Sequence, residues 1–355
     1  MAKSYYNVVG VMSGTSLDGI DIIYATYVYD NNWTFKIHKS ETLKYSEIWK
    51  SSLSQLVTKT LDELSEIDKA YSKYLGTVIS EFIKKHNIND INFIASHGHT
   101  ALHQPENGLT LQIGNQQILA NTLNEKVICD FRVQDVEYGG QGAPLVPIGD
   151  RLLFEKYGFC LNLGGFANIS FEENNERIAF DICPVNIVLN HYVFKLNLDF
   201  DDKGKLASTG KIHFELLTKL NQLEFYQQKP PKSLGLEWVK ENVIPLIDSY
   251  NLRIEDVLRT FVEHVAIQIS KILNQEKAKV LVTGGGAYND FLIHRIKFLS
   301  KSQIMIPSKE IIEFKEALVF GLLGVLRERN EVNCLKSVTG ASKNHSSGKI
   351  LIPNT

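Results

Sequence analysis

The chain has 355 residues, of which 44% are hydrophobic, and this length exceeds what one hydrophobic core usually serves. We therefore expect two domains. Its 38 Lys and Arg residues nearly balance 40 Asp and Glu residues, for a formal net charge of -2. This balance excludes a general attraction to nucleic acid or anionic membranes, so any anionic ligand must be bound by a local site.

The N-terminal stretch MAKSYYNVVGVMSG has no secretion-signal pattern, and polar residues interrupt every apolar run before it could span a bilayer. The four cysteines are scattered without a C-x-x-C pair, which favours buried free thiols over disulfides or a zinc site. They are Cys129, Cys160, Cys183 and Cys334. We expect a cytoplasmic protein that binds neither nucleic acid nor membrane.

The first predicted element is a β-hairpin whose tip is the polar segment GVMSGTSLDGID, residues 10–21. A P-loop is excluded, because there is no lysine and no helix follows. The tip offers backbone N–H groups, hydroxyls and the carboxylates of Asp18 and Asp21, which suit a phosphate and a hydrated magnesium ion. An ordinary Ser/Gly/Asp turn remains the alternative.

Two amphipathic helical stretches follow, over residues 45–59 and 61–87, and then a short apolar strand over 91–96. This strand runs into HGHTALHQP (97–105), which we interpret as a polar substrate loop, with a solvated loop as the alternative. Strand alternation would place His97 and His99 on one face. No acidic or cysteine partner lies nearby in the sequence, so a zinc site is disfavoured.

Residues 109–132 read as strand, helix and strand, and Arg132 follows this last strand. A guanidinium at that place can grip a carboxylate or sugar oxygens, or pair with Asp130 or Asp135 on the surface. The glycine-rich segment VQDVEYGGQGAPLVP (133–147) comes next.

The second half repeats the layout of the first, with strand, glycine turn and strand over 159–171 and a third strand over 178–182. Asp181 ends that third strand, where a carboxylate serves as a general base or caps the next helix. Residues 279–300 then read as strand, glycine turn and helix, where the start of the helix can face a phosphate or the turn can be only a tight connection. Glu316 opens an apolar helix, where an acidic side chain either interacts with the helix dipole or binds a ligand. The alternation indicates an α/β fold, and two domains of similar build would leave a ligand cleft between them.

Taken in order, these motifs resemble the anhydro-N-acetylmuramic acid kinases, relatives of actin, Hsp70 and hexokinase. GVMSGTSLDGID and DFRVQDVEYGGQGAPLVP are the longest matches, joined by HGHTALHQP, LNLGGFANIS, FDICPVN and TGGGAYN. The resemblance implies an α/β, two-domain, ribonuclease H-like fold with an interdomain active-site cleft. It places residues 1–148 and 320–355 in the first domain and 149–319 in the second.

The implied activity is an ATP-dependent kinase of peptidoglycan recycling, which opens the 1,6-anhydro ring of anhydro-N-acetylmuramic acid and phosphorylates O6. The products are N-acetylmuramic acid 6-phosphate and ADP, and Asp181 matches the catalytic base that activates water. ATP and Mg²⁺ are the implied cofactors, with Asp18 and Asp21 holding the metal through water. The implied nucleotide-binding residues are Gly14, Thr15, Ser16, Leu17, Asp18, Gly19, Ile20, Asp21, Gly164, Gly165, Asn168, Gly284, Gly285, Gly286 and Asn289.

The implied sugar-binding residues are His97, His99, Thr100, His103, Arg132, Gly140, Gln141, Pro144, Asn186 and Glu316. The chain departs from the family pattern D-T-G-P-G-N, because it reads Asp181, Ile182, Cys183, Pro184, Val185, Asn186. We expect Ile182 and Val185 to narrow the space beside Asp181. The alternatives are a nucleotide-gated sugar sensor without turnover and a kinase for a different sugar, and a homodimer stays open.

Overall fold

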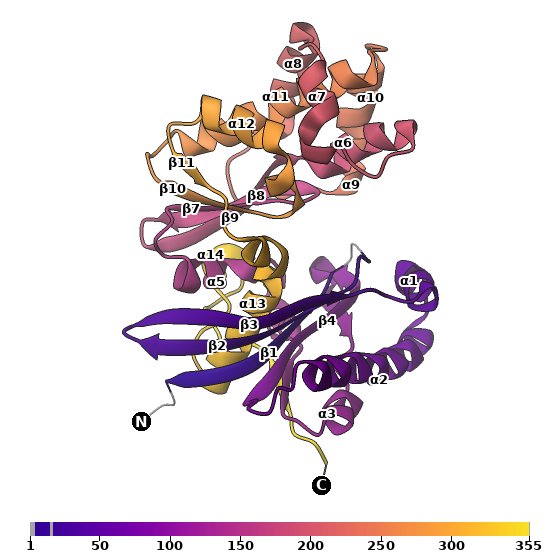
Figure 1. Ribbon diagram of the computed structural model, residues 1–355, viewed down its shortest axis with the longest axis vertical. Coiled ribbons are helices and arrows are strands. Elements are labelled where there is room, and N and C mark those ends of the chain that lie inside the picture. Colours follow the sequence, from indigo (N-terminus) through magenta and orange to yellow (C-terminus); the bar gives the residue numbers. More distant parts are fainter. Residues whose placement is uncertain (1–3, 15–16, 355) are drawn as a thin grey trace. The chain divides into compact units, whose positions relative to one another are not determined.

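A computed structural model describes residues 4–14 and 17–354 of the chain (Figure 1). It divides the chain into two compact units, which are Met1–Leu153 with Phe314–Thr355, and Phe154–Glu313. Helix α13 (Lys309–Glu328) carries the chain from the second unit back into the first. No helix in the described ranges is long and apolar enough to cross a membrane.

The first unit is built on a seven-stranded sheet in the order β12-β6-β4-β1-β2-β3, with β5 paired to β4. Its strands are β1 (Tyr5–Ser13), β2 (Ile20–Asp30), β3 (Asn32–Leu43), β4 (Phe93–Gln104), β5 (Leu109–Ile113), β6 (Val127–Cys129) and β12 (Lys349–Leu351). The first three strands form an antiparallel meander, whereas β4 runs parallel to both β1 and β6. The predicted hairpin is therefore present as β1 and β2.

Helices cover both faces of this sheet. On one face, Val9 and Ile22 pack in one buried cluster with Tyr71 of α2. On the other face, Tyr27 donates a hydrogen bond of 2.7 Å to the carbonyl of Leu318 in α13. The helices of this unit are α1 (Glu47–Ser54), η1 (Leu56–Thr58), α2 (Leu61–Lys85), η2 (Pro105–Asn107), α3 (Gln117–Leu123), α4 (Val133–Glu137), α5 (Val146–Leu153) and α14 (Lys336–Thr339).

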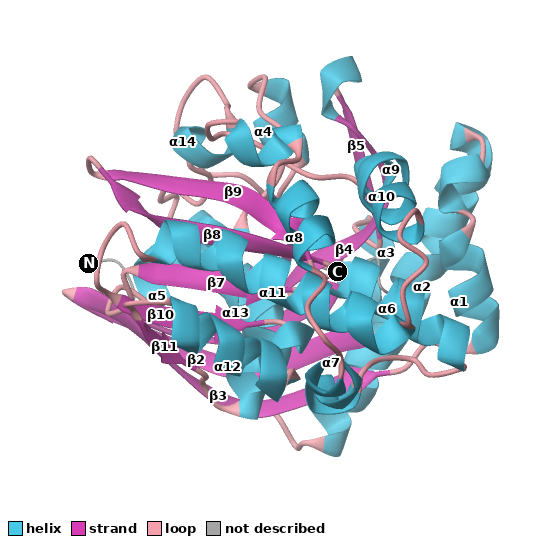
Figure 2. Cartoon of the chain, turned by 90° about the horizontal axis from the view of Figure 1, so that it is seen from above, coloured by secondary structure: helices cyan, strands magenta, loops and turns pink. Residues whose placement is uncertain are grey.

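The second unit is built on a five-stranded sheet in the order β11-β10-β7-β8-β9 (Figure 2). Its strands are β7 (Phe159–Leu163), β8 (Phe166–Glu173), β9 (Glu176–Pro184), β10 (Lys279–Thr283) and β11 (Gln303–Met305). Here too the first three strands are antiparallel, and β10 runs parallel to β7 and β11. This arrangement repeats that of β6-β4-β1-β2-β3, so the predicted α/β, ribonuclease H-like fold is confirmed in both units.

The core of the second unit lies between its sheet and the long helix α11 (Ile254–Leu273). A buried carboxylate joins α11 to α12, because Glu263 pairs with Arg259 at 2.8 Å and with Arg295 at 2.7 Å. The other helical segments are α6 (Asn186–Val193), η3 (Phe194–Leu196), η4 (Asp202–Gly204), α7 (Lys205–Thr209), α8 (Phe214–Asn221), η5 (Glu224–Gln227), α9 (Leu236–Trp238), the π-helix η6 (Val239–Val243), α10 (Ile244–Asp248), η7 (Gly285–Tyr288) and α12 (Asp290–Leu299).

Candidate functional site

The hairpin tip of the first unit connects Ser13 to Ile20, which face each other at the end of the β1–β2 ladder. Thr15 and Ser16 lie outside the described residues. In the described part of the tip, Leu17 N–H donates a hydrogen bond of 3.4 Å to the Gly14 carbonyl. A Cβ on Gly19 would lie 2.7 Å from the carbonyl oxygen of Leu43, so only glycine lets the tip pass this close to β3.

The two aspartates of the tip have different surroundings. Asp18 is exposed, whereas Asp21 is half-buried and accepts a 2.6 Å hydrogen bond from the Thr42 hydroxyl. Two water-accessible carboxylates are hard oxygen donors, the type that magnesium prefers. Ile20, the residue before Asp21, is fully buried in the core and anchors the start of β2.

The predicted polar loop at residues 97–105 is wrong for most of its length, because β4 continues to Gln104 and pairs with β5. The expectation that His97 and His99 share a face is also wrong. Between the pairs Val11–Ser96 and Ser13–His99 the register shifts, and Gly98 has φ 74°. This β-bulge inserts one residue and turns His99 to the opposite face.

Each histidine consequently has its own partners. His97 packs against Phe320 of α13, with ring centroids 4.6 Å apart, and His99 accepts or donates a 2.9 Å hydrogen bond with Ser13 Oγ on the α2 side. Burial lowers the pKa of His99 to about 4, and burial with the nearby Arg132 lowers the pKa of His97 well below its usual range. Both rings are therefore neutral at physiological pH.

The hydroxyl cluster around Ser13 has no signal in the sequence, because its members come from β1, from the loop before α1 and from α2. Ser13 Oγ lies 2.5 Å from Tyr45 Oη and 2.9 Å from Tyr71 Oη, and all of these groups are buried. The cluster fixes the last residue of β1 directly before the hairpin tip. His103 and Thr100 lie further along β4, where His103 Nδ1 contacts Thr110 Oγ1 at 3.0 Å.

Arg132 joins His97 to the glycine-rich loop. Its Nε donates to His97 Nε2 at 2.8 Å and its Nη1 donates to the carbonyl of Gly142 at 2.9 Å. In the described part of the chain these bonds hold Arg132, rather than a pair with Asp130 or Asp135. Within the same loop Gly140 is buried, whereas Gln141 and Pro144 are exposed.

Glu316 does not open its helix, as the sequence analysis expected. Helix α13 begins at Lys309, so Glu316 lies in its interior and cannot serve the helix dipole at the first turn. The side chain is exposed, and its negative charge acts on Arg132. Arg132, His97, the Gly140–Pro144 loop and Glu316 thus form one polar group in the first unit.

In the second unit the two predicted glycine turns pack against each other. A Cβ on Gly284 would lie 2.8 Å from the carbonyl oxygen of Leu163, and a Cβ on Gly286 would lie 2.7 Å from the Leu163 Cβ. Gly284 also has φ 80°, which glycine adopts without strain. By contrast, a Cβ on Gly285 would meet only Asn186 Nδ2 at 3.9 Å.

The start of α6 is bound to the first of these turns. Val185 N–H donates to the Gly165 carbonyl at 2.8 Å, and Asn186 N–H donates to the Gly164 carbonyl at 3.3 Å. Asn168 is exposed on β8, and it pairs across the ladder with Asp181. Asn289 caps α12, because its Oδ1 accepts the Leu292 N–H at 3.0 Å.

Asp181 lies in β9, half-buried, beside these turns. Its Oδ2 accepts a 2.8 Å hydrogen bond from Leu234 N–H, and its own N–H donates to the Lys232 carbonyl at 3.1 Å. Burial raises the pKa of the Asp181 carboxyl, and the bond from Leu234 lowers it by less. A carboxylate held in place with a raised pKa suits a general base.

The narrowing expected beside Asp181 stays a prediction, and the structure shows where the bulky residues are packed. Ile182, Cys183 and Val185 are at most 2% exposed and belong to the core of the second unit. A β-bulge at Ile182 separates the pairs Asn168–Asp181 and Ala167–Cys183, so the regular alternation of side chains is interrupted directly after Asp181. All four cysteines are free and buried, as predicted.

Comparisons with known proteins agree with the motif order. The family model described as anhydro-N-acetylmuramic acid kinase matches residues 6–353. Curated proteins of that name are similar over almost their whole length. The one from Acinetobacter baylyi is 32% identical over 368 residues, covering 94% of this chain and 96% of the relative. The one from Haemophilus influenzae is 32% identical over 381 residues, covering 99% and 98%. The one from Pseudomonas syringae pv. tomato is 34% identical over 336 residues, covering 89% and 90%. The chain therefore belongs to the anhydro-N-acetylmuramic acid kinase family.

Proposed function

We propose that this kinase hydrolyses the 1,6-anhydro ring of anhydro-N-acetylmuramic acid and transfers the γ-phosphoryl group of ATP to O6. The observation that carries the proposal is Asp181, a half-buried carboxylate with a raised pKa and one oxygen held by Leu234 N–H. The other oxygen remains to take a proton from water. Peptidoglycan recycling is the process that would supply such a sugar.

In the proposed reaction Asp181 removes a proton from the water that attacks C1 of the sugar. The bond between C1 and O6 breaks as C1 gains oxocarbenium character, and O6 bonds to the γ-phosphorus. The bond from that phosphorus to the β,γ-bridging oxygen breaks and ADP leaves. The proton on Asp181 passes to solvent, which restores the base.

The proposed ATP contacts come from backbone groups rather than charged side chains. Gly285 offers open space next to Asn186, where a nucleoside can lie against the chain. Gly14 and Gly19 supply N–H groups at the hairpin tip. Asp18 and Asp21 fit a hydrated magnesium ion, because both are water-accessible oxygen donors, and the ion would supply charge neutralisation at the phosphates.

The proposed sugar contacts are the imidazole of His97, the guanidinium of Arg132 and the carboxylate of Glu316. His99 faces the other side of β4, where its bond to Ser13 Oγ gives it a positioning role at the hairpin tip in this proposal. Arg132 is positioned by His97 and by the Gly142 carbonyl, which supports a fixed hydrogen-bonding fork for sugar oxygens. Thr100 and His103 on β4, and the exposed Gln141 and Pro144 of the Gly140–Pro144 loop, complete the proposed set.

Mass spectrometry in isotopically heavy water tests this function. The protein is incubated with ATP, magnesium and 1,6-anhydro-N-acetylmuramic acid, and we expect a product with one phosphate and one heavy oxygen at C1. An intact sugar with bound ATP would refute turnover of this substrate and favour the sugar sensor. Phosphorylation without the heavy oxygen would refute the role of water.

A further inference from the structure

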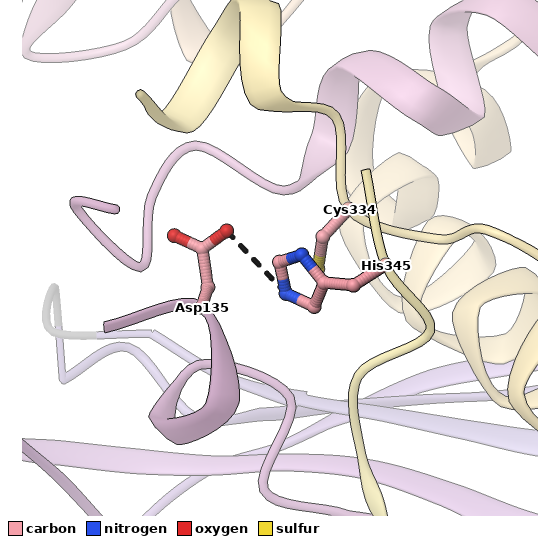
Figure 3. Close-up of side chains that lie close together, drawn as sticks. All are labelled: Asp135, Cys334 and His345. Carbon is pink, nitrogen blue, oxygen red and sulfur yellow. Dashed lines mark ion pairs between the residues drawn. The ribbon is translucent and has the colours of Figure 1, made fainter. Parts of the chain in front are cut away.

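Three buried side chains that the proposed reaction does not use lie close together in the first unit. They are Asp135 of α4, and Cys334 and His345 of the C-terminal segment (Figure 3). One ligand atom from each lies within 4.8 Å of the others, and all three residues are buried. The set combines a carboxylate, a thiol and an imidazole, which is a mixture typical of transition-metal sites.

The backbone explains why Cys334 and His345 are neighbours. They form an isolated antiparallel bridge, in which Cys334 N–H donates to the His345 carbonyl at 3.1 Å and His345 N–H donates back at 3.2 Å. Residues paired in this way project their side chains to the same side. The bridge therefore presents sulfur and imidazole together toward α4.

The carboxylate of Asp135 is fixed in orientation by two short hydrogen bonds. Its Oδ1 accepts from Thr339 Oγ1 at 2.7 Å, and its Oδ2 accepts from Gly142 N–H at 2.7 Å. Each carboxylate oxygen has a further lone pair after these bonds. Ligating carboxylates in proteins are usually held by such partners.

His345 carries the strongest indication of a bound cation. Its Nδ1 lies 3.1 Å from the carbonyl of Lys343, which can only accept, so Nδ1 bears the proton. In the neutral ring Nε2 then has a lone pair, and this atom is buried without a hydrogen-bond partner. It points at Asp135 Oδ1 from 3.5 Å, so in this tautomer of the neutral ring a nitrogen lone pair faces a carboxylate oxygen (Figure 3).

A metal ion placed between these atoms would satisfy both. Zinc binds nitrogen and oxygen at about 2.0–2.2 Å, and tetrahedral geometry then separates the two donors by roughly 3.4 Å. The observed 3.5 Å fits this separation. Magnesium and calcium are excluded by the thiol and imidazole, because both ions prefer oxygen ligands.

We propose that Asp135, Cys334 and His345 bind one zinc ion, with water in the fourth position. Cys334 binds such an ion as the thiolate. Binding then replaces the S–H bond with an S–Zn bond and releases the proton to solvent.

The site has a clear mechanical consequence. Asp135 also contacts the glycine-rich loop, since a Cβ on Gly140 would overlap its carboxylate. Gln141 N–H in the same loop donates to the Thr339 carbonyl at 2.8 Å. Zinc would therefore tie the C-terminal segment and α4 to the Gly140–Pro144 loop, independently of whether the proposed reaction is correct.

Metal content of the full chain tests the proposal. Protein treated with a chelator and then with zinc should retain about one zinc ion per chain in native mass spectrometry and elemental analysis. It should release about one proton per ion bound and show a higher melting temperature. Cobalt substitution should add a thiolate-to-cobalt charge-transfer band, which requires Cys334 at the metal.

Variants separate the site from adventitious binding. Cys334→Ser and His345→Ala should each lower metal affinity by at least about 10-fold, whereas Cys160→Ser, at a buried cysteine of β7, should leave it unchanged. Failure of the wild-type chain to retain zinc, or a cobalt complex without the charge-transfer band, would overturn the proposal. Those wild-type measurements decide the matter even if a variant does not fold, and an Asp135–His345 ion pair would then explain the cluster.

Discussion

Two adjacent glycines of the second unit, Gly285 and Gly286, should differ in how replacement by alanine affects stability. A Cβ on Gly286 would lie 2.7 Å from the Leu163 Cβ and 3.0 Å from the Leu163 carbonyl oxygen, and backbone cannot swing aside. Overpacking of this kind costs about 1–3 kcal/mol. For a domain of this size each kcal/mol lowers the melting temperature by about 2–4 °C, so Gly286→Ala should lose several degrees.

Gly285 offers the matched control. Its Cβ would meet only Asn186 Nδ2 at 3.9 Å, an ordinary contact, so Gly285→Ala should melt within about 1 °C of the wild type. The added methyl group would instead stand in the space proposed for the nucleoside, and the Kd for ATP should rise.

Differential scanning calorimetry and isothermal titration with ATP measure both effects. Equal melting temperatures for the two variants would refute the packing argument. Unchanged ATP affinity in Gly285→Ala would refute the placement of the nucleoside, while leaving the packing argument intact.

Three further changes probe the reaction and the pH response. Asp181→Asn keeps an acceptor for Leu234 N–H but cannot take a proton from water. The rate of ADP release with the sugar should therefore fall roughly 10²- to 10⁴-fold, with ATP binding intact. Undiminished turnover would contradict the assigned role. Arg132→Lys replaces the two nitrogens that bond His97 and Gly142 by a single nitrogen without the planar fork. KM for the sugar should therefore rise about 10-fold with kcat less affected, and a loss confined to kcat contradicts this. The pKa of His99 is lowered to about 4 in the folded chain, so the unfolded chain binds more protons between pH 4 and 6.5. Stability should therefore fall as pH drops through that window, by up to about 3 kcal/mol from this group, and His99→Gln should flatten the dependence of melting temperature on pH. If His99→Gln leaves the slope of melting temperature against pH unchanged, groups other than His99 control that dependence.

The hairpin, the glycine turns and the repeated layout could be predicted because their signals are local. Apolar strands flanking a Gly, Ser and Asp cluster specify β1 and β2 without knowledge of the rest of the chain. The prediction for His97 and His99 failed at one residue, since Gly98 with φ 74° breaks the alternation on which face assignment depends. A single glycine within a polar segment does not distinguish a bulge from a loop.

The start of α13 could have been predicted from its N-cap residue, which a search for apolar periodicity alone overlooks. Pro307 and Ser308 precede Lys309, and Ser308 Oγ accepts the Ile311 N–H at 3.4 Å, as an N-cap residue does. Because four charged residues interrupt the apolar ones in the first two turns, KEIIEFK, attention to the continuous apolar run places the helix start too late, at Glu316. The cluster of Asp135, Cys334 and His345 had no local signal, since about 200 residues of chain separate its parts.

The departures from the family pattern around Asp181 bear on whether the protein turns sugar over. Small residues in D-T-G-P-G-N are replaced by Ile182, Cys183 and Val185, and their side chains fill the core beneath β9. Asp181 itself keeps its bond from Leu234 N–H and its half-buried carboxylate. Because the substitutions change the packing below the strand and not the groups that hold the carboxylate, they do not by themselves favour a sensor over an enzyme. The proposed proton transfer therefore keeps the carboxylate that it needs, with one oxygen bonded to Leu234 N–H.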